Sequence, residues 1–580
     1  MNAAAASRAA AGRPGRDRTV ACIDVGGLSC RYQDAARSSL EGVDLRVGPG
    51  QIVAVMGASG AGKSTLLKCL TGIVPGFEKA AVGGEGRVLE VRLDALAPGR
   101  LAGRVGMVFQ DFEAQLFSTN VALEVGFALD QMGHERAEIH ARTAAALDAV
   151  GLAGFAARDP ATLSGGEKQR LAMAAVLALD PEVVLLDEPT TDVDPLGKAA
   201  IFALLRAFAA RGAAVVVVEH ETRAAEVADR LVILSEGRVA GAGESRELLR
   251  DTELLERSGV RPRDLDKLAR ALDVERRLDS LDEAETLLRE RGWIPSAAGL
   301  EPDPGPVRQG EPLLELRDVR HVYPGGTVAL DGVSLDIARG EFVALIGQNG
   351  SGKTTLAKHL NGLLRPTSGS VRLGGSDTRE MALARIARRI GYVFQDPDHQ
   401  LFCESVGAEI AYGPRHLGLD EVEVTARVER ELEVAGLGSR RDDDPFLLSK
   451  GERQRLAVAS VLALEPEVVI LDEPTTGLDD REQRAILAVL RALHRAGRTL
   501  IVITHAPWLV ARYATRAVLM SRARILFDGE VRALFAETAL LREACFALPD
   551  ATALGMRFGV PVRSAEELIS AIDRARGGHG

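Results

Sequence analysis

The stretch "GASGAGKSTLL" runs from Gly57 to Leu67, and "GQNGSGKTTLA" runs from Gly347 to Ala357. Each follows a short apolar run, "QIVAVM" or "EFVALI", that predicts a strand buried on both faces. The glycines let successive backbone N–H groups turn inward around an anion, and the next helix adds its positive end. Each stretch therefore predicts a strand, a phosphate-binding loop and a helix at the start of an α/β domain.

The chain repeats at long range. The two glycine loops lie 290 residues apart (347 − 57), whereas Gln110 and Gln395 lie 285 apart (395 − 110), as do His220 and His505. The difference (290 − 285 = 5) places a five-residue insertion in the first copy, and we expect a loop there, at "AVGGEGRV". Two complete copies predict two tandem domains of one kind, each with a parallel-sheet core.

The copies suggest the domain boundaries. We expect a disordered tail over residues 1–18, a first domain over 19–293, a linker rich in proline and glycine over 294–312, and a second domain over 313–580. The segment "SLDEAETLLRERG" from Ser280 loosely matches "SAEELISAIDRARG" near the end of the chain. Each domain is therefore expected to end in a small helical extension.

Bulk properties exclude several classes of protein. The 580 residues are too many for one core, and the net charge of −11 argues against a general nucleic-acid binder. Five cysteines without a C-x-x-C pair favour reduced thiols over a disulfide framework. No apolar run approaches the roughly 18 residues that cross a bilayer, so any work at a membrane would need another chain to span it.

The motifs assign chemistry to particular side chains. Lys63 and Lys353 are suited to reach the β- and γ-phosphates of a nucleotide, and the hydroxyls of Ser64 and Thr354 are suited to Mg²⁺. The remaining loop residues expected to cradle the phosphates are Gly57, Ala58, Ser59, Gly60, Ala61, Gly62 and Thr65 in the first copy, and Gly347, Gln348, Asn349, Gly350, Ser351, Gly352 and Thr355 in the second.

Polar residues that follow apolar strands complete each set. Asp187 and Asp472 are expected to hold Mg²⁺, and the next residues, Glu188 and Glu473, to act as general bases toward water. We expect two further residues of each copy to reach the reacting groups: a histidine toward the γ-phosphate, and a glutamine toward Mg²⁺ or the water. These residues are His220, His505, Gln110 and Gln395.

Together these motifs, with "LSGGE" at 163–167 and "LSKGE" at 448–452, resemble the ATP-binding cassette (ABC) ATPases over nearly the whole chain. The resemblance implies Mg²⁺-dependent ATP hydrolysis, with Tyr32 and Tyr323 stacking on adenine. It also implies two composite sites, in which the phosphate loop of one half faces the signature segment of the other. The signature residues so implied are Ser164, Gly165 and Gly166 opposite Lys353, and Ser449 and Gly451 opposite Lys63.

The signatures differ at one position, where Lys450 stands in place of Gly165. Glycine tolerates more backbone conformations than lysine does, so this position must suit a side chain. Two alternatives are open for Lys450: its side chain adds a positive charge near the phosphates, or it points to solvent. We expect the two ATP sites to differ in rate or affinity, and the site of Lys63 and Ser449 to be the unusual one.

A narrower resemblance concerns the segments that follow the glutamines. "FQDPDHQLFCESVGAEIAYGPRHLGL" (394–419) and "FQDFEAQLFSTNVALEVGFAL" (109–129) look like those of energy-coupling factor (ECF) and cobalt-type transporter ATPases. This implies an ATPase at the cytoplasmic face of the cell membrane, bound to a transmembrane coupling protein and a substrate-binding membrane protein. The cargo would be a vitamin, a vitamin precursor, or cobalt or nickel ions.

Two alternatives are open at this point: a two-cassette ATPase acting on ribosomes and a fused sugar-importer ATPase. The first typically has a basic arm between cassettes, whereas residues 241–312 hold 17 acidic and 12 basic residues. The second often has a degenerate second half, whereas both halves here keep their lysine, acids and histidine. Both comparisons favour the membrane importer.

Overall fold

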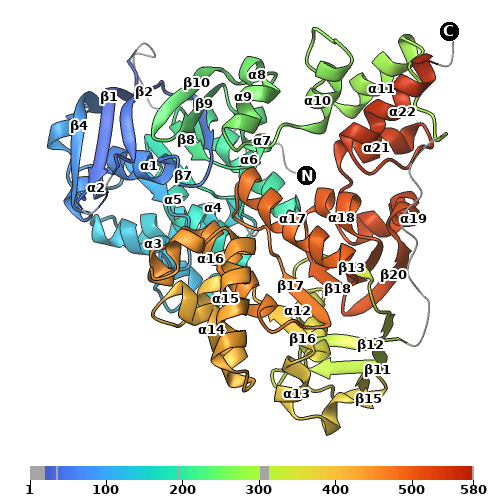
Figure 1. Ribbon diagram of the computed structural model, residues 1–580. Helices are drawn as coiled ribbons and strands as arrows, with labels where there is room; N and C mark the ends of the chain where they lie inside the picture. Colours follow the sequence, from blue (N-terminus) through green and yellow to red (C-terminus); the bar gives the residue numbers. More distant parts are fainter. Residues whose placement is uncertain are drawn as a thin grey trace. The chain divides into compact units, whose positions relative to one another are not determined.

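The computed structural model describes residues 20–577, apart from 34, 36, 192, 194, 299 and 301–311. The chain forms two compact units whose boundary lies between Pro262 and Arg263. Figure 1 follows the first unit from blue to green and the second from green to red. The expected tail over 1–18 and most of the expected linker lie outside the described residues.

The first unit is built on a six-stranded sheet with the order β10-β9-β3-β8-β7-β6. Neighbours from β9 to β6 pair in parallel, and only the edge strand β10 is antiparallel. Every residue of the central strands is buried, which explains their unbroken apolar sequences. The strands are β3 (Ile52–Gly57), β6 (Val105–Val108), β7 (Val183–Asp187), β8 (Ala214–Val218), β9 (Arg230–Ser235) and β10 (Arg238–Glu244).

An antiparallel sheet with the order β2-β1-β4-β5 packs beside this core. Its strands are β1 (Ile23–Tyr32), β2 (Leu40–Val47), β4 (Ala80–Val88) and β5 (Val91–Arg92). The prediction of a loop at "AVGGEGRV" was wrong, because these residues belong to β4. A Cβ atom at Gly86 would lie 2.1 Å from the carbonyl oxygen of Asp24 on β1, so glycine serves a close approach between strands there.

Helices complete the first unit. A helical subdomain contains α3 (Val121–Gln131), α4 (Arg136–Ala149) and α5 (Gly165–Ala178), whose apolar faces share a core with the parallel sheet. The other helices are α1 (Lys63–Thr71), α2 (Ile73–Gly76), α6 (Pro195–Ala210), α7 (Thr222–Val227), α8 (Ser245–Leu248) and α9 (Thr252–Arg257).

The second unit repeats this plan with the sheet orders β16-β17-β18-β13-β19-β20 and β12-β11-β14-β15. Its strands are β11 (Leu314–Val322), β12 (Val328–Ile337), β13 (Phe342–Gly347), β14 (Ser368–Leu373), β15 (Ser376–Asp377), β16 (Ile390–Val393), β17 (Val468–Asp472), β18 (Thr499–Ile503), β19 (Arg516–Ser521) and β20 (Arg524–Glu530). Its cassette helices are α12 (Lys353–Leu360), α13 (Leu383–Ala387), α14 (Val406–His416), α15 (Glu421–Ala435), α16 (Lys450–Leu462), α17 (Asp480–Arg495), α18 (Pro507–Tyr513), α19 (Val531–Ala536) and α20 (Thr538–Glu543). The two tandem α/β domains expected from the repeat are confirmed.

Both helical extensions belong to the second unit. The pair α10 (Asp264–Ala271) and α11 (Leu281–Glu290) comes from the first copy, and α21 (Asp550–Arg557) and α22 (Ala565–Gly577) come from the second. The four helices share one apolar core, and Figure 1 shows α11 beside α21 and α22. The predicted domain boundary at residue 293 thus stays a prediction. The boundary between the two compact units lies 31 residues before it (293 − 262 = 31).

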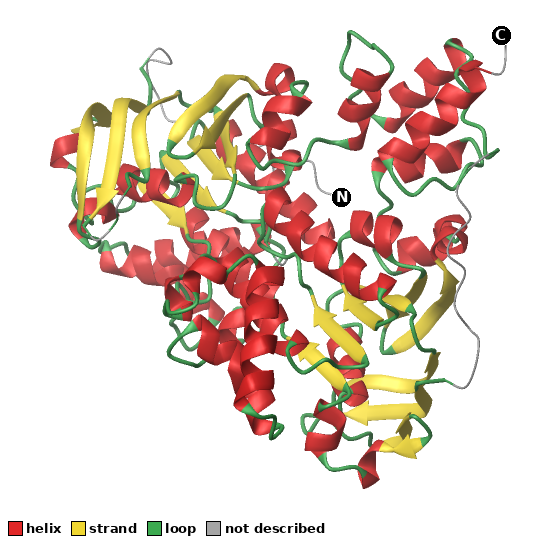
Figure 2. Cartoon of the chain, viewed as in Figure 1, coloured by secondary structure: helices red, strands yellow, loops and turns green. Residues whose placement is uncertain are grey.

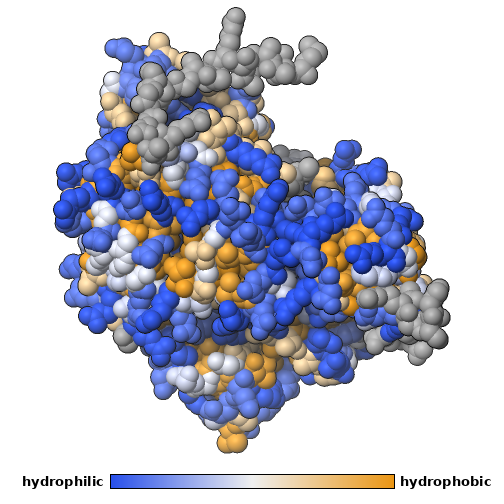
Figure 3. All heavy atoms as spheres, turned by 90° about the horizontal axis from the view of Figure 1, so that it is seen from above, coloured by the Kyte–Doolittle hydropathy of each residue, from blue (hydrophilic) through white to orange (hydrophobic). Residues whose placement is uncertain are grey.

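Three general features of the fold are its layering, its exposed surface and the length of its helices. Figure 2 shows the strands of each unit gathered into sheets with helices packed on them. On the face drawn in Figure 3, hydrophilic residues predominate and hydrophobic ones gather in patches between them. Among the described residues, no helix combines the length and the apolar character needed to cross a bilayer.

Candidate functional site

The glycine loops connect the central strand of each parallel sheet to the following helix. In the first unit β3 ends at Gly57 and α1 begins at Lys63. Gly57 has φ +150°, and a Cβ atom there would lie 2.2 Å from the carbonyl oxygen of Leu234. Only glycine fits such a position, so the loop keeps its backbone close to β9. N–H groups of a loop of this shape can turn inward around an anion.

The loop lysines fold back over their own loops. Lys63 Nζ donates hydrogen bonds to the carbonyl oxygens of Gly57 (3.0 Å) and Ala58 (2.9 Å). Lys353 does the same at 2.8 and 2.9 Å. Both side chains are at least nine-tenths buried, and their ammonium groups are held against the loop backbone. The structure thus places the expected phosphate-loop residues 57–65 and 347–355 in two equivalent strand–loop–helix turns.

The tyrosines expected to stack on adenine lie close to the same loops. The Tyr32 hydroxyl is 3.4 Å from Thr65 Oγ1, and that of Tyr323 is 3.1 Å from Thr355 Oγ1. A cavity of about 600 Å³, lined by Arg31 and Lys79 among others, lies against Tyr32. Each tyrosine therefore lies next to its phosphate loop, and its stacking on adenine stays a prediction.

The aspartates that end the two strands, Asp187 and Asp472, lie beside hydroxyl groups of the phosphate loops. Asp187 is the last residue of β7 and is 3% exposed. Burial raises its pKa to about 6, although a hydrogen bond from Ser64 opposes the shift. In the second unit Asp472 Oδ2 accepts a hydrogen bond from Thr354 Oγ1 at 3.0 Å. The structure thus brings each acid together with the hydroxyl of its phosphate loop.

These acids suit a hard cation. Asp187 Oδ1 is buried and has no hydrogen-bond partner, so it lacks the compensation that a buried carboxylate oxygen requires. Mg²⁺ prefers oxygen ligands and is usually held by one or two carboxylates together with phosphates and water. Within the described residues, no group of three or more His, Cys, Asp or Glu side chains could enclose a metal ion. The site therefore fits a magnesium ion that arrives with the nucleotide.

The glutamates that come directly after these aspartates lie near the predicted histidines and glutamines. Glu188 and Glu473 have φ +49° and +47°, a left-handed conformation that costs energy for a side chain of this kind and is found at functional sites. Glu188 Oε1 lies 2.6 Å from His220 Nε2, and its Oε2 accepts a hydrogen bond from Gln110 Nε2 at 2.9 Å. The three side chains form one connected group at the carboxyl ends of β6, β7 and β8.

The second unit reproduces this group with a difference at the histidine. Glu473 Oε1 lies 2.8 Å from Nδ1 of His505, whereas the first unit uses Nε2. The backbone N–H of His505 also donates to Glu473 Oε2 at 3.3 Å. Gln395 follows β16 as Gln110 follows β6. Both units thus hold a buried carboxylate against an imidazole.

The signature serines begin the third helix of each helical subdomain. Ser164 precedes α5 and Ser449 precedes α16, and both are exposed. A Cβ atom at Gly165 would meet nothing within 4 Å, so a lysine at the equivalent position 450 fits without backbone strain. Gly451 differs, because a Cβ atom there would lie 1.9 Å from Glu482 Oε1. The pairing of each serine with the opposite phosphate loop stays a prediction.

Sequence reasoning missed two polar residues that distinguish the units. The Tyr392 hydroxyl donates a 2.9 Å hydrogen bond to Asp472 Oδ2, and methionine (Met107) takes its place in the first unit. Glu219 precedes His220 and accepts a 2.8 Å hydrogen bond from the backbone N–H of Thr190. Burial raises the pKa of Glu219 to about 7. The only signal for these residues in the sequence was a difference between the two copies: Thr504 stands at the position equivalent to Glu219.

The residues beneath the tyrosines also differ between the units. In the second unit the ring of His321 lies 4.7 Å from that of Tyr323 and 4.7 Å from that of His359. The first unit has two buried cysteines, Cys30 and Cys69, at these positions of the repeat. The two tyrosines therefore have different neighbouring side chains.

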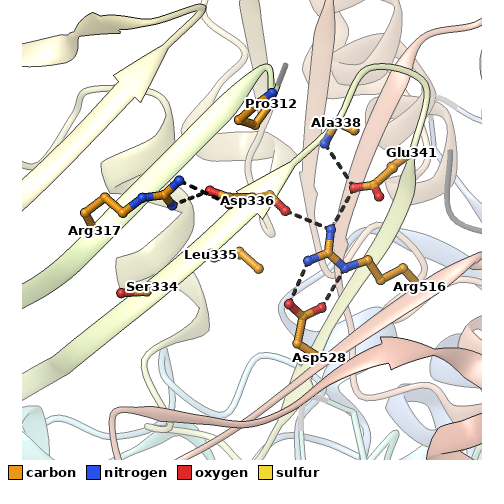
Figure 4. A pocket seen from close by; sticks show the side chains of 9 residues that line it. All are labelled: Pro312, Arg317, Ser334, Leu335, Asp336, Ala338, Glu341, Arg516 and Asp528. Atoms are coloured by element: carbon orange, nitrogen blue, oxygen red, sulfur yellow. Dashed lines mark hydrogen bonds and ion pairs between the residues drawn. The ribbon is translucent and has the colours of Figure 1, made fainter. Parts of the chain in front are cut away.

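A charged cavity of about 340 Å³ lies at the opposite, amino ends of the second unit's parallel strands. Figure 4 shows Arg516, the first residue of β19, between Glu341 and Asp528. Arg516 Nη1 donates to Glu341 Oε2 at 2.8 Å, while Nε and Nη2 donate to Asp528 at 2.6 and 2.7 Å. Because its acids bind the arginine, we interpret the cluster as a structural brace between strands.

Comparisons with known proteins agree with this geometry. The sequence pattern of the family described as "ABC transporter" matches residues 40–191 and 330–476. A protein of Caldanaerobacter subterraneus subsp. tengcongensis is 41% identical over 568 residues, covering 95% of this chain and 99% of its own. A protein of Methanosarcina acetivorans is 39% identical, covering 91% and 88%, and one of Vibrio vulnificus is 32% identical, covering 90% and 92%. All three are named as ABC transporter ATP-binding proteins.

Among solved structures, CbiO1 from Clostridium perfringens, described as part of the ABC transporter complex CbiONQ, is 35% identical. It matches 41% of this chain and 97% of its own, with a TM-score of 0.37.

Proposed function

This chain belongs to the ABC transporter ATP-binding proteins, and we propose that it couples ATP hydrolysis at two composite sites to import through a membrane complex of the ECF type. Proteins of this family hydrolyse ATP. The observation that carries the proposal is the gathering, in both units, of a phosphate loop, a buried strand-end aspartate and a glutamate held by a histidine. A purely structural protein has no need of two complete hydrolytic sets.

The side chains support a defined order of events. The loop N–H groups and Lys63 bind the β- and γ-phosphates and favour the charge that develops on them. Glu188 accepts a proton from a water molecule as the water oxygen attacks the γ-phosphorus, and the bond to the β,γ-bridging oxygen breaks. ATP and water thereby give ADP and inorganic phosphate. His220 lies 2.6 Å from the glutamate, so it would orient the carboxylate, and we assign it a contact with the γ-phosphate.

When bound, Mg²⁺ neutralises charge on the β- and γ-phosphate oxygens. Ser64 and Asp187 in the first unit, and Thr354 and Asp472 in the second, would hold it. Gln110 and Gln395 follow the neighbouring strand in each unit, and from there their amides would reach the ion or the attacking water. The orphaned Oδ1 atom of Asp187 supports this assignment.

We assign Ser449 to the Lys63 site and Ser164 to the Lys353 site. Ser449 and Ser164 are exposed at helix N-termini, which favour negatively charged groups. Lys450 adds a positive charge beside Ser449. The site of Lys63 thus gains a cation that the other site lacks, which supports different rates or affinities at the two sites.

A trapping experiment tests this cross-pairing. A chain with both Glu188→Gln and Glu473→Gln retains two ATP molecules, and adding Ser449→Ala lowers the retained number to one. Adding Lys353→Ala to that variant then leaves none, whereas adding Lys63→Ala still leaves one. The reverse pattern, with one ATP after Lys353→Ala and none after Lys63→Ala, would show that each serine serves its own half and would overturn the pairing.

The segments that follow the glutamines support docking of membrane partners. Glu124 is buried and accepts hydrogen bonds from the N–H groups of Phe117 (3.1 Å) and Ser118 (2.7 Å), which pins the segment to α3. The exposed ring of Phe117 packs edge-to-face on Phe127, with centroids 4.7 Å apart. Phe402 and Tyr412 form the same pair in the second unit. Two rigid, exposed aromatic edges of this kind suit coupling helices of a transmembrane protein.

The remaining details of the proposal come from the resemblance of these segments to ECF and cobalt-type ATPases. The partners would be a transmembrane coupling protein and a substrate-binding membrane protein at the cytoplasmic face of the membrane. The cargo would be a vitamin, a vitamin precursor, or cobalt or nickel ions.

A further inference from the structure

The aspartate that ends β17 accepts two hydrogen bonds on one oxygen. Asp472 Oδ2 lies 3.0 Å from Thr354 Oγ1 and 2.9 Å from the Tyr392 hydroxyl, and both hydroxyl groups donate to it. Asp472 is 4% exposed, so these donors supply the hydrogen bonding that a buried carboxylate requires. Tyr392 belongs to β16, which pairs with β17 in parallel. The second donor therefore comes from a neighbouring strand, outside the phosphate loop.

Methionine stands at the equivalent position of the first unit. Met107 of β6 lies opposite Leu185 of β7. Tyr392 lies opposite Ile470 of β17, which is the equivalent residue of the second copy. Methionine has no hydrogen to donate to an oxygen, and Asp187 Oδ1 is buried without a hydrogen-bond partner in the described part of the chain. This carboxylate therefore lacks the donor that β16 supplies in the second unit.

Packing holds the Tyr392 ring in place. The ring lies edge-to-face on Phe394, with centroids 5.0 Å apart and planes at 63°. It also packs against the apolar core that the two sheets of the second unit share. A ring packed in this way leaves few positions open to its hydroxyl group. The donor to Asp472 is therefore in position before any ion arrives.

A donor of this kind affects metal binding through the carboxylate. Hydrogen bonds to a ligating carboxylate orient it, and loss of such a bond typically lowers metal affinity about 10- to 100-fold. Both donors of Asp472 lie on Oδ2, which leaves Oδ1 for a cation. The carboxylate of Asp187 lacks the tyrosine donor, so more of its freedom is lost only when a cation binds.

We propose that Tyr392 is a positioning residue for the magnesium ion of the Lys353 site, and that this site binds the divalent cation of its nucleotide more tightly than the Lys63 site does. The inference deepens the proposed function, because it rests on the assignment of Asp472 and Asp187 as magnesium ligands. At limiting Mg²⁺ the Lys353 site fills with the magnesium nucleotide first. The two sites are then loaded in a fixed order.

The test measures nucleotide binding rather than turnover. Binding of a non-hydrolysable ATP analogue to the full-length chain is measured by equilibrium dialysis in excess Mg²⁺ and again in EDTA. The Kd in EDTA divided by the Kd in Mg²⁺ gives the contribution of the cation, and we call this quotient the cation ratio. Lys63→Ala leaves only the Lys353 site to bind the analogue, and Lys353→Ala leaves only the Lys63 site. We expect the larger cation ratio at the Lys353 site.

Two substitutions of Tyr392 isolate its hydroxyl group. In the chain that carries Lys63→Ala, Tyr392→Phe keeps the ring and removes the donor, and Tyr392→Met copies the first unit. Both should lower the cation ratio about 10- to 100-fold, while binding of the analogue in EDTA stays the same. A purely structural tyrosine would lower both affinities by the same factor and leave the ratio unchanged. The matched control is Met107→Leu in the chain that carries Lys353→Ala, where the ratio should not change.

Three results would overturn the proposal: a cation ratio at the Lys353 site no larger than at the Lys63 site, a ratio that Tyr392→Phe leaves unchanged, or an equal loss of affinity with and without Mg²⁺. Each of them leaves the proposed function intact where Mg²⁺ strengthens binding at both sites. Binding that Mg²⁺ strengthens at neither site would instead refute the magnesium assignment within the proposed function, and this proposal with it.

Discussion

Replacement of the two glutamates is the sharpest test of the catalytic assignment. Glu188→Gln keeps the shape of the side chain and changes only its ability to accept a proton. The carbonyl oxygen of the new amide can still accept the hydrogen bond from Gln110, and its NH₂ group can donate to His220 Nε2. The fold and nucleotide binding should therefore survive, as they should in Glu473→Gln.

The size of the loss follows from the role of the glutamates. General-base catalysis contributes about 10²- to 10⁴-fold, which is about 2.7 to 5.4 kcal/mol at 1.36 kcal/mol per tenfold. If the two sites turned over independently and equally, each single variant would keep about half of the rate, since the intact site is unaffected. The double variant should keep about 1% or less.

The assay is steady-state release of phosphate from saturating Mg-ATP, with ATP binding measured in parallel. We expect unequal losses from the two single variants, because Lys450, Tyr392 and Glu219 each distinguish one site from the other. Matched controls are Asp180→Asn and Glu465→Gln, in which acids at turns before β7 and β17 are neutralised away from the loops.

Two results would refute this reasoning. A double variant that binds ATP and keeps more than about a tenth of the rate would exclude the glutamates as general bases, because the expected loss is at least 10²-fold. Equal losses from the single variants would count against asymmetry between the sites.

Three further predictions concern stability. Burial raises the folded-state pKa of Glu219 from 4.5 to about 7. Because the folded state then binds a proton that the unfolded state lacks, the free energy of unfolding falls as the pH rises from about 4.5 to 7. Glu219→Gln should remove this pH dependence in denaturant titrations of the first unit. Arg516→Met leaves Glu341 and Asp528 without their cation and should lower the free energy of unfolding of the second unit by about 3–5 kcal/mol, as measured by chemical denaturation; an unchanged midpoint would contradict the brace. Tyr392→Phe removes a hydrogen bond to a buried carboxylate and should cost about 1.5–3 kcal/mol in the same measurement, whereas Met107→Leu should cost less than about 1.5 kcal/mol.

The architecture was predictable from the sequence where local chemistry leaves few choices. Gly57 and Lys63 belong to a strand–loop–helix turn that few other sequences can form, and the apolar runs of β7 and β8 suit only strands covered on both faces. The acids and histidines follow such strands, so their convergence at one edge of the sheet followed from the parallel order.

Other features depend on contacts between distant parts of the chain. Glycines usually mark turns, but Gly86 in β4 makes room for the backbone of Asp24, which no local pattern reveals. The docking of α11 on α21 joins segments more than 250 residues apart, and their amphipathic sequences did not identify a partner. Tyr392 takes the place of Met107 within an apolar strand, and in such a strand the sequence alone suggests a core residue.

The central claim, that this ATPase energises a membrane importer, is tested most directly by co-purification. The tagged chain is recovered from detergent-solubilised membranes of its host, beside a Phe117→Ser, Phe402→Ser variant and a Val422→Ser control, which alters an apolar residue 82% exposed on α15. We predict that integral membrane proteins accompany the wild type and the control and are lost from the double variant. Recovery with ribosomes, or membrane proteins retained equally by all three chains, would contradict the account.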